Sequence, residues 1–505
     1  MGTMFISDLG GELCRTELNV YSNRMASYLQ SKGVEKGDRV AVMMPNILQY
    51  PIVVEAVLKA GAVLVNVNPL YTADELGHIV ADSGAKVLVV FNGASSSVNV
   101  AVNEDVTIVA TGVGDMLSGA KRHVVNLATT LLKGFKYPIV EHDKFLDIIQ
   151  KDWGKFEPVE TKPEDMALIQ YTGATTGKAK GVELTYANIE ANAEQVLDRM
   201  DDMLGKGDIV IAPLPLYHVY AFIVHMIYLP SVNGTSLLVA NPRDINKFIK
   251  TLRNNRFTGF VGLNTLFNAL MNHKNFDKVD FSESKITISG GMTLTPDVYD
   301  RWLDTTGTMI AEGYGLTETS PVLCLSDPRA PVVGSVGKFV NGVRYKIADD
   351  GELLVKGPNV FKRYHNNKEA TKEAFTTLGW FRTGDIVELD SEGNVFITDR
   401  KKNMIIVSGF NVYPTEVENA LSKHPAVAEA GVIGVGDNGN EKVVAFVVKK
   451  GNVTAEELRD FCRIDMTSYK VPRKIVFVDQ LPKSPVGKVL HKELRNDPKY
   501  IKQTS

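Results

Sequence analysis

The 505-residue sequence predicts an α/β protein with a large N-terminal domain of mainly parallel sheets and helices, a β-rich subdomain, and a small α/β C-terminal domain. Three observations support this fold class. Short apolar segments alternate with helical patterns through the N-terminal domain, and glycines separate short strand patterns at 334–352. After a cationic turn at 399–402, a second alternation of strands and helices begins. We therefore expect two domains, 1–399 and 400–505.

Strand and helix patterns follow one another in two stretches of the N-terminal domain. They occur at 39–44, 47–60, 62–67, 208–213, 217–229, 236–240 and 246–252. Repeated strand–helix–strand units are typical of parallel sheets covered by helices. Residues 91–141 are less regular, and we expect a peripheral crossover there. In the C-terminal domain the pattern predicts a strand at 404–407, a helix from Thr415, and strands at 426–435 and 443–448.

Composition excludes several classes of function. The formal net charge of −3 provides no basic surface for nucleic acid. The three cysteines are far apart and odd in number, as expected for reduced thiols in the cytoplasm. No cluster of Cys and His has the spacing of a metal site.

The sequence predicts no membrane span. Residues 1–19 lack the basic start and apolar core of a secretory signal. The longest apolar run, 219–230, has about half the length that a bilayer requires. We therefore expect a cytoplasmic protein, for which any membrane contact is peripheral, at the inner face of the membrane.

Residues 171–181 are the most informative segment, because small, hydroxylated and cationic side chains replace apolar ones there. The segment follows a strand pattern at 166–170, and open α/β folds bind ligands at the carboxyl ends of strands. Backbone N–H groups of glycine, threonine hydroxyls and lysine ammonium groups all bind phosphate. The candidate phosphate ligands are Thr172, Gly173, Thr175, Thr176, Gly177, Lys178 and Lys180.

This loop is not a Walker A motif, which has four residues between its first glycine and a Gly-Lys-Ser/Thr. Here three residues separate Gly173 from Gly177, and Ala179 follows Lys178. A flexible glycine-rich linker is the alternative interpretation.

Taken with later motifs, the loop resembles the phosphate loop of the adenylate-forming superfamily, which includes acyl-CoA synthetases, luciferases and the adenylation domains of peptide synthetases. The resemblance covers nearly the whole chain. It includes PLYH at 215–218, SGG at 289–291, EGYGLTE at 312–318, WFRTGD at 380–385, DRKK at 399–402, SGFNVYP at 408–414 and PKSPVGK at 482–488. Segments 66–76, 170–181, 241–245 and 262–270 are most similar to bacterial long-chain fatty acid CoA ligases.

The resemblance implies a reaction in which a fatty acid carboxylate attacks the α-phosphate of ATP and forms acyl-AMP. Lys488 is then the principal catalytic residue, beside the carboxylate and the α-phosphate. Glu318 holds Mg²⁺, and Thr317 donates its hydroxyl to the α-phosphate. The implied nucleotide-binding residues are Gly291, Tyr314, Gly315, Asp385 and Arg400. An ordinary surface lysine, an ordinary turn and surface ion pairs are the respective alternatives.

In the second half-reaction the CoA thiol attacks acyl-AMP after the C-terminal domain has rotated about Lys402. The resemblance assigns Ser408, Gly409 and Phe410 to the tunnel for the pantetheine arm. His218 is a candidate for orienting the thiol or the carbonyl, and Phe222 is a candidate gate to the acyl tunnel. Core packing is the alternative for both residues.

Three departures and several alternatives remain open. Ala174 stands where family loops carry a second glycine, and the chain begins later than family members do. The connection around Ile347 to Gly351 is also shorter than in the family. The favoured function is a long-chain fatty acid CoA ligase that uses ATP, Mg²⁺ and CoA. Its alternatives are a medium-chain or aryl acid CoA ligase, a carrier-protein acyl ligase, and a catalytically weak acyl or nucleotide sensor. The family also makes a homodimer plausible.

Overall fold

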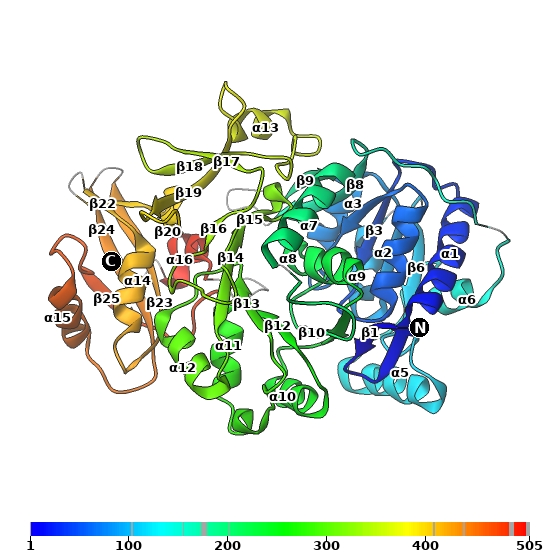
Figure 1. Ribbon diagram of the computed structural model, residues 1–505, viewed down its shortest axis with the longest axis horizontal. Helices are drawn as coiled ribbons and strands as arrows, with labels where there is room; N and C mark the ends of the chain where they lie inside the picture. Colours follow the sequence, from blue (N-terminus) through cyan, green and yellow to red (C-terminus); the bar gives the residue numbers. More distant parts are fainter. Residues whose placement is uncertain are drawn as a thin grey trace.

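The computed structural model describes residues 2–102, 105–154, 156–172, 179–200, 202–407, 410–437, 440–483 and 489–500. Two large sheets and a β-rich subdomain precede a separate C-terminal lobe, so the predicted fold class is confirmed (Figure 1). Within the described ranges, no helix has both the length and the apolar character that a membrane crossing requires.

The first sheet has the order β7-β6-β5-β3-β4-β8-β9. Its pairs are parallel except for the hairpin that joins β8 and β9. Its strands are β3 (Arg39–Met43), β4 (Val63–Asn66), β5 (Ala85–Phe91), β6 (Thr107–Thr111), β7 (Asp143–Lys144), β8 (Met166–Thr172) and β9 (Lys180–Thr185). Buried apolar runs such as β4 are typical of parallel strands covered on both faces. The associated helices are α1 (Arg15–Ser31), α2 (Gln49–Lys59), α3 (Ala73–Ser83), α4 (Ser95–Ala101), α5 (Gly119–Lys133) and α6 (Phe145–Gln150).

The second sheet has the order β16-β15-β14-β13-β12-β10-β11-β1-β2, with a parallel centre and antiparallel edges. Its strands are β1 (Thr3–Ser7), β2 (Gly11–Cys14), β10 (Ile209–Ala212), β11 (Thr235–Leu238), β12 (Gly259–Gly262), β13 (Ile286–Gly290), β14 (Ile310–Gly315), β15 (Val322–Leu325) and β16 (Lys338–Phe339). Helices α7 (Tyr186–Met200), α8 (Val219–Phe222), α9 (Leu229–Ser231), α10 (Ile245–Asn254), α11 (Asn264–Met271) and α12 (Pro296–Thr306) accompany it. One face packs on an aromatic cluster in which the rings of Phe267 and Trp302 are 4.7 Å apart.

The β-rich subdomain is a four-stranded antiparallel sheet of β17 (Arg344–Ile347), β18 (Glu352–Lys356), β19 (Phe381–Leu389) and β20 (Val395–Arg400). Helix α13 (Lys368–Ala374) belongs to its β18–β19 connection. The C-terminal lobe contains β21 (Ile405–Val407), β22 (Phe410–Val412), β23 (Val427–Asp437), β24 (Asn440–Lys449), β25 (Lys474–Phe477), α14 (Pro414–Ser422), α15 (Ala455–Asp465) and α16 (His491–Asn496). Every element predicted for this lobe is present.

Residues 91–141 are more regular than the sequence suggests. The segment contains α4 and α5, and β6 is an internal strand of the first sheet between β5 and β7. The expectation of a merely peripheral crossover was therefore wrong for β6. Its four consecutive buried residues, Ile108 to Thr111, gain hydrogen bonds and contacts from the sheet that the local sequence does not reveal.

Candidate functional site

The ends of the predicted phosphate loop are fixed by the β8–β9 hairpin. Thr172 at the end of β8 is opposite Lys180 at the start of β9. A ring nitrogen of His78, Nε2, lies 3.0 Å from the carbonyl oxygen of Ala179. Of the predicted loop ligands, Gly173, Thr175, Thr176, Gly177 and Lys178 lie outside the described residues, as does Ala174. The described flanks of the loop, Thr172 and Lys180, are thus paired strand ends.

The predicted nucleotide residues Tyr314, Asp385 and Arg400 form one connected group. The Tyr314 hydroxyl donates to Asp385 Oδ2 at 2.6 Å, and Arg400 Nε lies 2.6 Å from Asp385 Oδ1. Asp385 is 1% exposed, so both interactions operate with little competition from water. Attraction to Asp385 raises the pKa of Arg400, and burial raises the pKa of Tyr314. Asp385 and Arg400 thus form an ion pair that lies beside the aromatic ring of Tyr314.

Asp385 and Arg400 meet because β19 and β20 are adjacent antiparallel strands that place them opposite each other. Tyr314 comes from β14 of the second sheet, so the group joins the subdomain to the large domain. Gly315, next to it, must be glycine: a Cβ there would lie 1.8 Å from the Pro321 carbonyl oxygen. Gly291, after β13, has a φ of +79°, a left-handed backbone that also favours glycine.

Glu318 is connected through Tyr364 to Lys180, which follows the predicted phosphate loop. The Tyr364 hydroxyl donates to Glu318 Oε1 at 2.7 Å, and Lys180 Nζ lies 5.3 Å from the centre of the Tyr364 ring. Burial, together with the Glu318 carboxylate, raises the pKa of Tyr364, so its hydroxyl stays protonated and donates. Thr317 begins the short 3₁₀ turn Thr317–Thr319 that carries Glu318.

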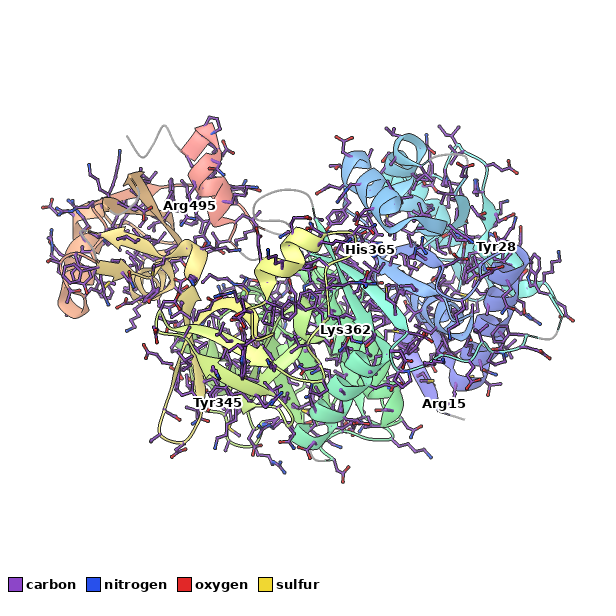
Figure 2. All side chains as sticks on the ribbon, turned by 90° about the horizontal axis from the view of Figure 1, so that it is seen from above. Arg15, Tyr28, Tyr345, Lys362, His365 and Arg495 are labelled. Carbon is purple, nitrogen blue, oxygen red and sulfur yellow. The ribbon has the colours of Figure 1, made fainter. Side chains whose placement is uncertain are left out.

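Tyr364 is held by the strand beside the loop. Glu183 of β9 accepts from Arg363 Nε at 2.6 Å, and His365 Nδ1 lies 2.8 Å from its other oxygen. Burial alone would raise the pKa of Glu183, but these two hydrogen bonds outweigh it and lower the pKa. Figure 2 shows His365 near the centre of the molecule, between the subdomain and the lobe of the first sheet.

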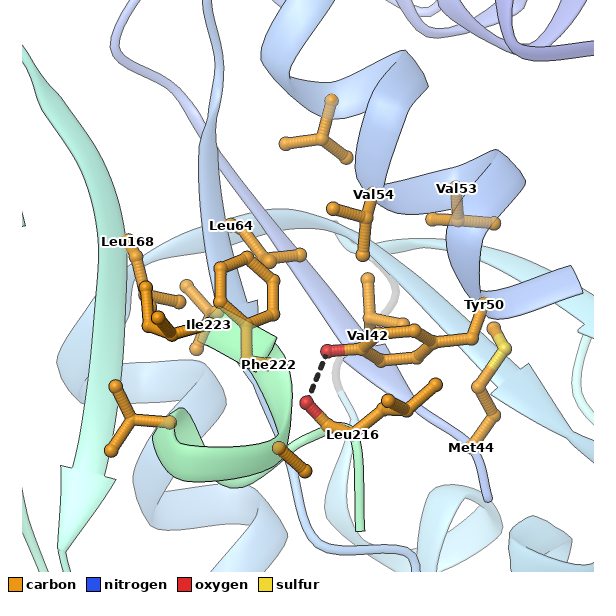
Figure 3. Packing of buried hydrophobic residues seen from close by; sticks show 14 of the residues in the cluster. Val42, Met44, Tyr50, Val53, Val54, Leu64, Leu168, Leu216, Phe222 and Ile223 are labelled. Carbon is orange, nitrogen blue, oxygen red and sulfur yellow. Dashed lines mark hydrogen bonds between the residues drawn. The ribbon is translucent and has the colours of Figure 1, made fainter. Parts of the chain in front are cut away.

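His218 is positioned by a buried polar network that begins in the first sheet. Asn66 Nδ2 donates to Gln170 Oε1 at 3.3 Å, and Gln170 Nε2 donates to the Tyr217 carbonyl at 3.0 Å. The Tyr50 hydroxyl lies 2.9 Å from the Leu216 carbonyl oxygen (Figure 3). His218 itself caps α8, with Nδ1 accepting from the Tyr220 N–H at 3.4 Å. Burial lowers the pKa of this imidazole, which favours the neutral form.

Phe222 lies in the hydrophobic core. It is 1% exposed, and Figure 3 shows its ring beside Leu64 and Ile223. This packing is what the core alternative predicts. A gate at this position requires the ring to leave its present place, and the gate stays a prediction.

Only some of the residues predicted for the C-terminal lobe and its hinge are among the described residues. Phe410 is 56% exposed and stacks on Tyr469 with ring centres 4.8 Å apart. Lys402 belongs to the 3₁₀ turn Lys401–Asn403 between the subdomain and the lobe. Lys401 binds Asp350 at 2.6 Å on the subdomain side. Ser408, Gly409 and Lys488 lie outside the described residues.

Glu318 is the predicted acidic ligand for a cation. Among the described residues no group of three or more His, Cys, Asp or Glu side chains gathers as a metal site. Mg²⁺ typically binds one or two carboxylates and completes its coordination with phosphates and water. A single glutamate near a phosphate loop therefore fits Mg²⁺ that arrives with a nucleotide.

Glu312, the first residue of the EGYGLTE motif, carries a perturbed carboxyl group. It is 6% exposed and accepts from the Leu294 N–H at 3.2 Å. Burial raises its pKa from 4.5 to about 7. The folded state binds this proton more tightly than the unfolded state does. The free energy of unfolding should therefore decrease by on the order of 3 kcal/mol as the pH rises from about 4.5 through 7.

We expect Glu312→Gln to remove this pH dependence and to stabilise the protein above pH 7, because the amide needs no proton. Urea unfolding of the two proteins across this pH range measures the difference. Parallel stability profiles would contradict the prediction.

Sequence reasoning missed Tyr364, Tyr50 and the Glu183–His365 pair. Tyr364 contacts Glu318 across 46 residues of sequence, and Tyr50 reaches Leu216 across 166. No local motif marks such contacts. The one available signal was a polar residue within an apolar pattern, as with Glu183 in β9.

Comparison with protein families agrees with this geometry. The model of the AMP-binding enzyme family matches residues 3–365, and that of the AMP-binding enzyme C-terminal domain matches 416–488. The chain belongs to the AMP-binding enzyme family. This AMP-binding enzyme is 42% identical to a long-chain-fatty-acid–CoA ligase of Escherichia coli O6:H1, with 97% of this chain and 91% of that protein covered. The corresponding ligase of Bacillus subtilis is 34% identical, with 97% and 90% covered.

Solved structures show the same fold. ATP-bound MatB from Rhodopseudomonas palustris has a TM-score of 0.86 at 27% identity, covering 99% of this chain and 96% of that one. Apo MatB, with the same coverage and identity, has a TM-score of 0.75. The anthranilate CoA ligase AuaEII with anthranoyl-AMP also has a TM-score of 0.86, at 25% identity. The whole-chain similarity is therefore higher to the ATP-bound structure of MatB than to its apo structure.

Proposed function

We propose that this enzyme is an ATP-dependent long-chain fatty acid–CoA ligase that forms AMP. The observation that carries the proposal is the 42% identity to curated long-chain ligases over 97% of the chain. The match to the AMP-binding enzyme family model over residues 3–365 supports the use of ATP. The Tyr314–Asp385–Arg400 group supplies the ring and the charges that a nucleoside requires.

The first half-reaction makes the carboxylate oxygen into a leaving group. A carboxylate oxygen of the fatty acid bonds to the α-phosphorus of ATP, and the bond to pyrophosphate breaks. Negative charge gathers on the phosphate oxygens, so fixed cations and donors are the main catalytic requirement. We assign these roles to Lys488, Thr317 and the loop ligands.

We assign the remaining nucleotide contacts to the Tyr314–Asp385–Arg400 group and to Glu318. Tyr314 lies against adenine, and Asp385 accepts from the ribose hydroxyls through the lone pairs that Tyr314 and Arg400 leave unused. Glu318 would hold Mg²⁺, which would neutralise phosphate charge when bound. In the second half-reaction the CoA sulfur attacks the acyl carbonyl and AMP leaves. His218, neutral and held at its place by α8, orients the thiol or the carbonyl.

Release of AMP by the purified protein, with ATP, Mg²⁺, CoA and a panel of acids from short to long chain, tests the function. CoA-dependent turnover that peaks with long-chain acids is the expected result. A peak with aryl or medium-chain acids, or transfer to a carrier protein, would replace the substrate assignment. Binding of ATP without turnover of any acid would favour a sensor.

We expect Tyr364→Phe to raise the Mg²⁺ concentration needed for half-maximal activity by about tenfold or less, because Glu318 loses the hydrogen bond that orients it. Titration of activity with Mg²⁺ measures this. Tyr345→Phe, on the outer β17 strand of the subdomain, is the matched control. Equal Mg²⁺ dependence in both variants would show that Tyr364 does not position Glu318.

A further inference from the structure

One amphipathic helix turns its apolar side chains toward solvent. In α5, Val124, Leu127 and Leu131 are spaced i, i+3, i+7 and therefore share one face. Their exposed fractions are 62%, 59% and 73%, and Leu132 is 85% exposed. A helix on the surface of a protein normally buries such a stripe, but α5 has no buried residue from Gly119 to Lys133.

The opposite, polar side of α5 attaches the helix to the protein. Asn126 Oδ1 accepts from the Gly114 N–H at 2.7 Å, and Asn126 Nδ2 donates to Asp115 Oδ1 at 2.8 Å. One turn earlier, Arg122 Nε donates to the Leu117 carbonyl at 3.2 Å. Asp115 is 4% exposed, so this anchor is fixed. The helix is thus held with its apolar stripe outward, and Figure 1 shows it at the lower margin of the molecule.

Residues 116–140, which include the stripe, carry charge of one sign. Residues 116–140 contain Lys121, Arg122, Lys133 and Lys136 but no Asp or Glu, in a chain whose net charge is −3. Just beyond the helix, Ile139 is 90% exposed. An outward apolar stripe flanked by cations is the pattern of a helix that lies in the interface of an anionic bilayer.

We propose that α5 docks this protein on an anionic lipid bilayer, with Val124, Leu127, Leu131 and Leu132 among the acyl chains and the exposed cations Lys121, Lys133 and Lys136 at the headgroups. A second copy of the chain fits the stripe poorly, because face-to-face pairing would oppose cations without any carboxylate from 116–140. The purpose of the docking rests on the proposed function, since long-chain acids partition into bilayers. The docking itself requires no catalysis.

Co-sedimentation of the full chain with vesicles, without ATP or CoA, tests the proposal. The vesicles contain phosphatidylglycerol and phosphatidylcholine, or phosphatidylcholine alone. We expect binding to the anionic vesicles, and at least about a tenfold lower partition coefficient for Leu127→Glu/Leu131→Glu. The matched control, Leu378→Glu/Ile464→Glu, alters side chains that are 73% and 76% exposed and should bind as the unaltered protein does.

Three results would overturn the proposal. The first is that the unaltered protein does not bind anionic vesicles. The second is that Leu127→Glu/Leu131→Glu binds them as well as the unaltered protein does. The third is that the control variant loses as much vesicle binding as the α5 variant. A change in oligomeric mass in the α5 variant, with no vesicle binding by the unaltered protein, would make the stripe a protein interface instead. Leu131→Trp gives a second measurement that needs no disruptive change: brominated lipids should quench the added fluorescence.

The outcome is separable from the proposed ligase activity. Turnover of an acid supplied in detergent micelles should be unchanged in Leu127→Glu/Leu131→Glu, because α5 contributes no residue to the site. Loss of vesicle binding by the α5 variant with full turnover supports both proposals. Vesicle binding by the unaltered protein without turnover of any acid supports the docking and contradicts the ligase function.

Discussion

Lys488→Ala should lower the rate of acyl-AMP formation by about a hundred- to a thousandfold, because a fixed cation no longer meets the charge that develops on the α-phosphate. The second half-reaction should be nearly unaffected. The family resemblance implies that rotation of the C-terminal domain carries this lysine away from the site before CoA attacks. Pyrophosphate release measures the first step. Transfer from synthetic acyl-AMP to CoA measures the second.

Lys483→Ala is the matched control for this experiment. Lys483 lies in the same PKSPVGK motif, and its Nζ binds Glu429 at 2.5 Å within the C-terminal lobe. We expect both half-reactions to keep their rates in this variant. Equal losses in the two half-reactions of Lys488→Ala would mean that the lysine serves the fold of the lobe and not adenylation.

Asp385→Asn should reduce kcat/KM for ATP by about a hundredfold and also lower the stability. The buried carboxylate binds Arg400 and Tyr314, and removal of its charge leaves the guanidinium without its partner. Breaking a buried charged pair on one side costs on the order of 3 to 5 kcal/mol. Initial rates at varied ATP and the thermal midpoint together measure both effects.

Asp350→Asn provides the comparison for Asp385→Asn. Asp350 also pairs with a cation of the domain boundary, Lys401 at 2.6 Å, but its side chain is 50% exposed. Exposed pairs contribute little, so we expect less than about a twofold change in kcat/KM. A similar loss in both variants would indicate a general effect on the boundary instead of a contact with the nucleotide.

The fold was largely predictable because its signals are local. The alternation at 39–67 and 208–252 appears as parallel strands and helices within a few residues of the expected bounds. Strand β6 was not recognised, since its pattern is short and its stability comes from β5 and β7 on either side. Local sequence carries the period of a strand but not the identity of its neighbours.

The site was predictable to the extent that its residues occur in motifs. Tyr314, Asp385 and Arg400 were predicted separately, and the structure brings them together. Tyr364 and Tyr50 were not predicted, because each reaches its partner only through the tertiary fold. Exposure was equally hidden: neither α5 nor the outward direction of its stripe was predicted, and that direction depends on the Asn126 anchor.

The Gln170 network gives two parts of the site a common origin. Gln170 belongs to β8, the strand that leads into the phosphate loop, and its side chain holds the Tyr217 carbonyl next to His218. His218 therefore takes its position from the first sheet, although the strand before it, β10, belongs to the second. A shift of β8 would therefore act on both its own end at Thr172 and the backbone beside His218. If these two positions serve the phosphate and the thiol as proposed, one strand couples the two half-reactions.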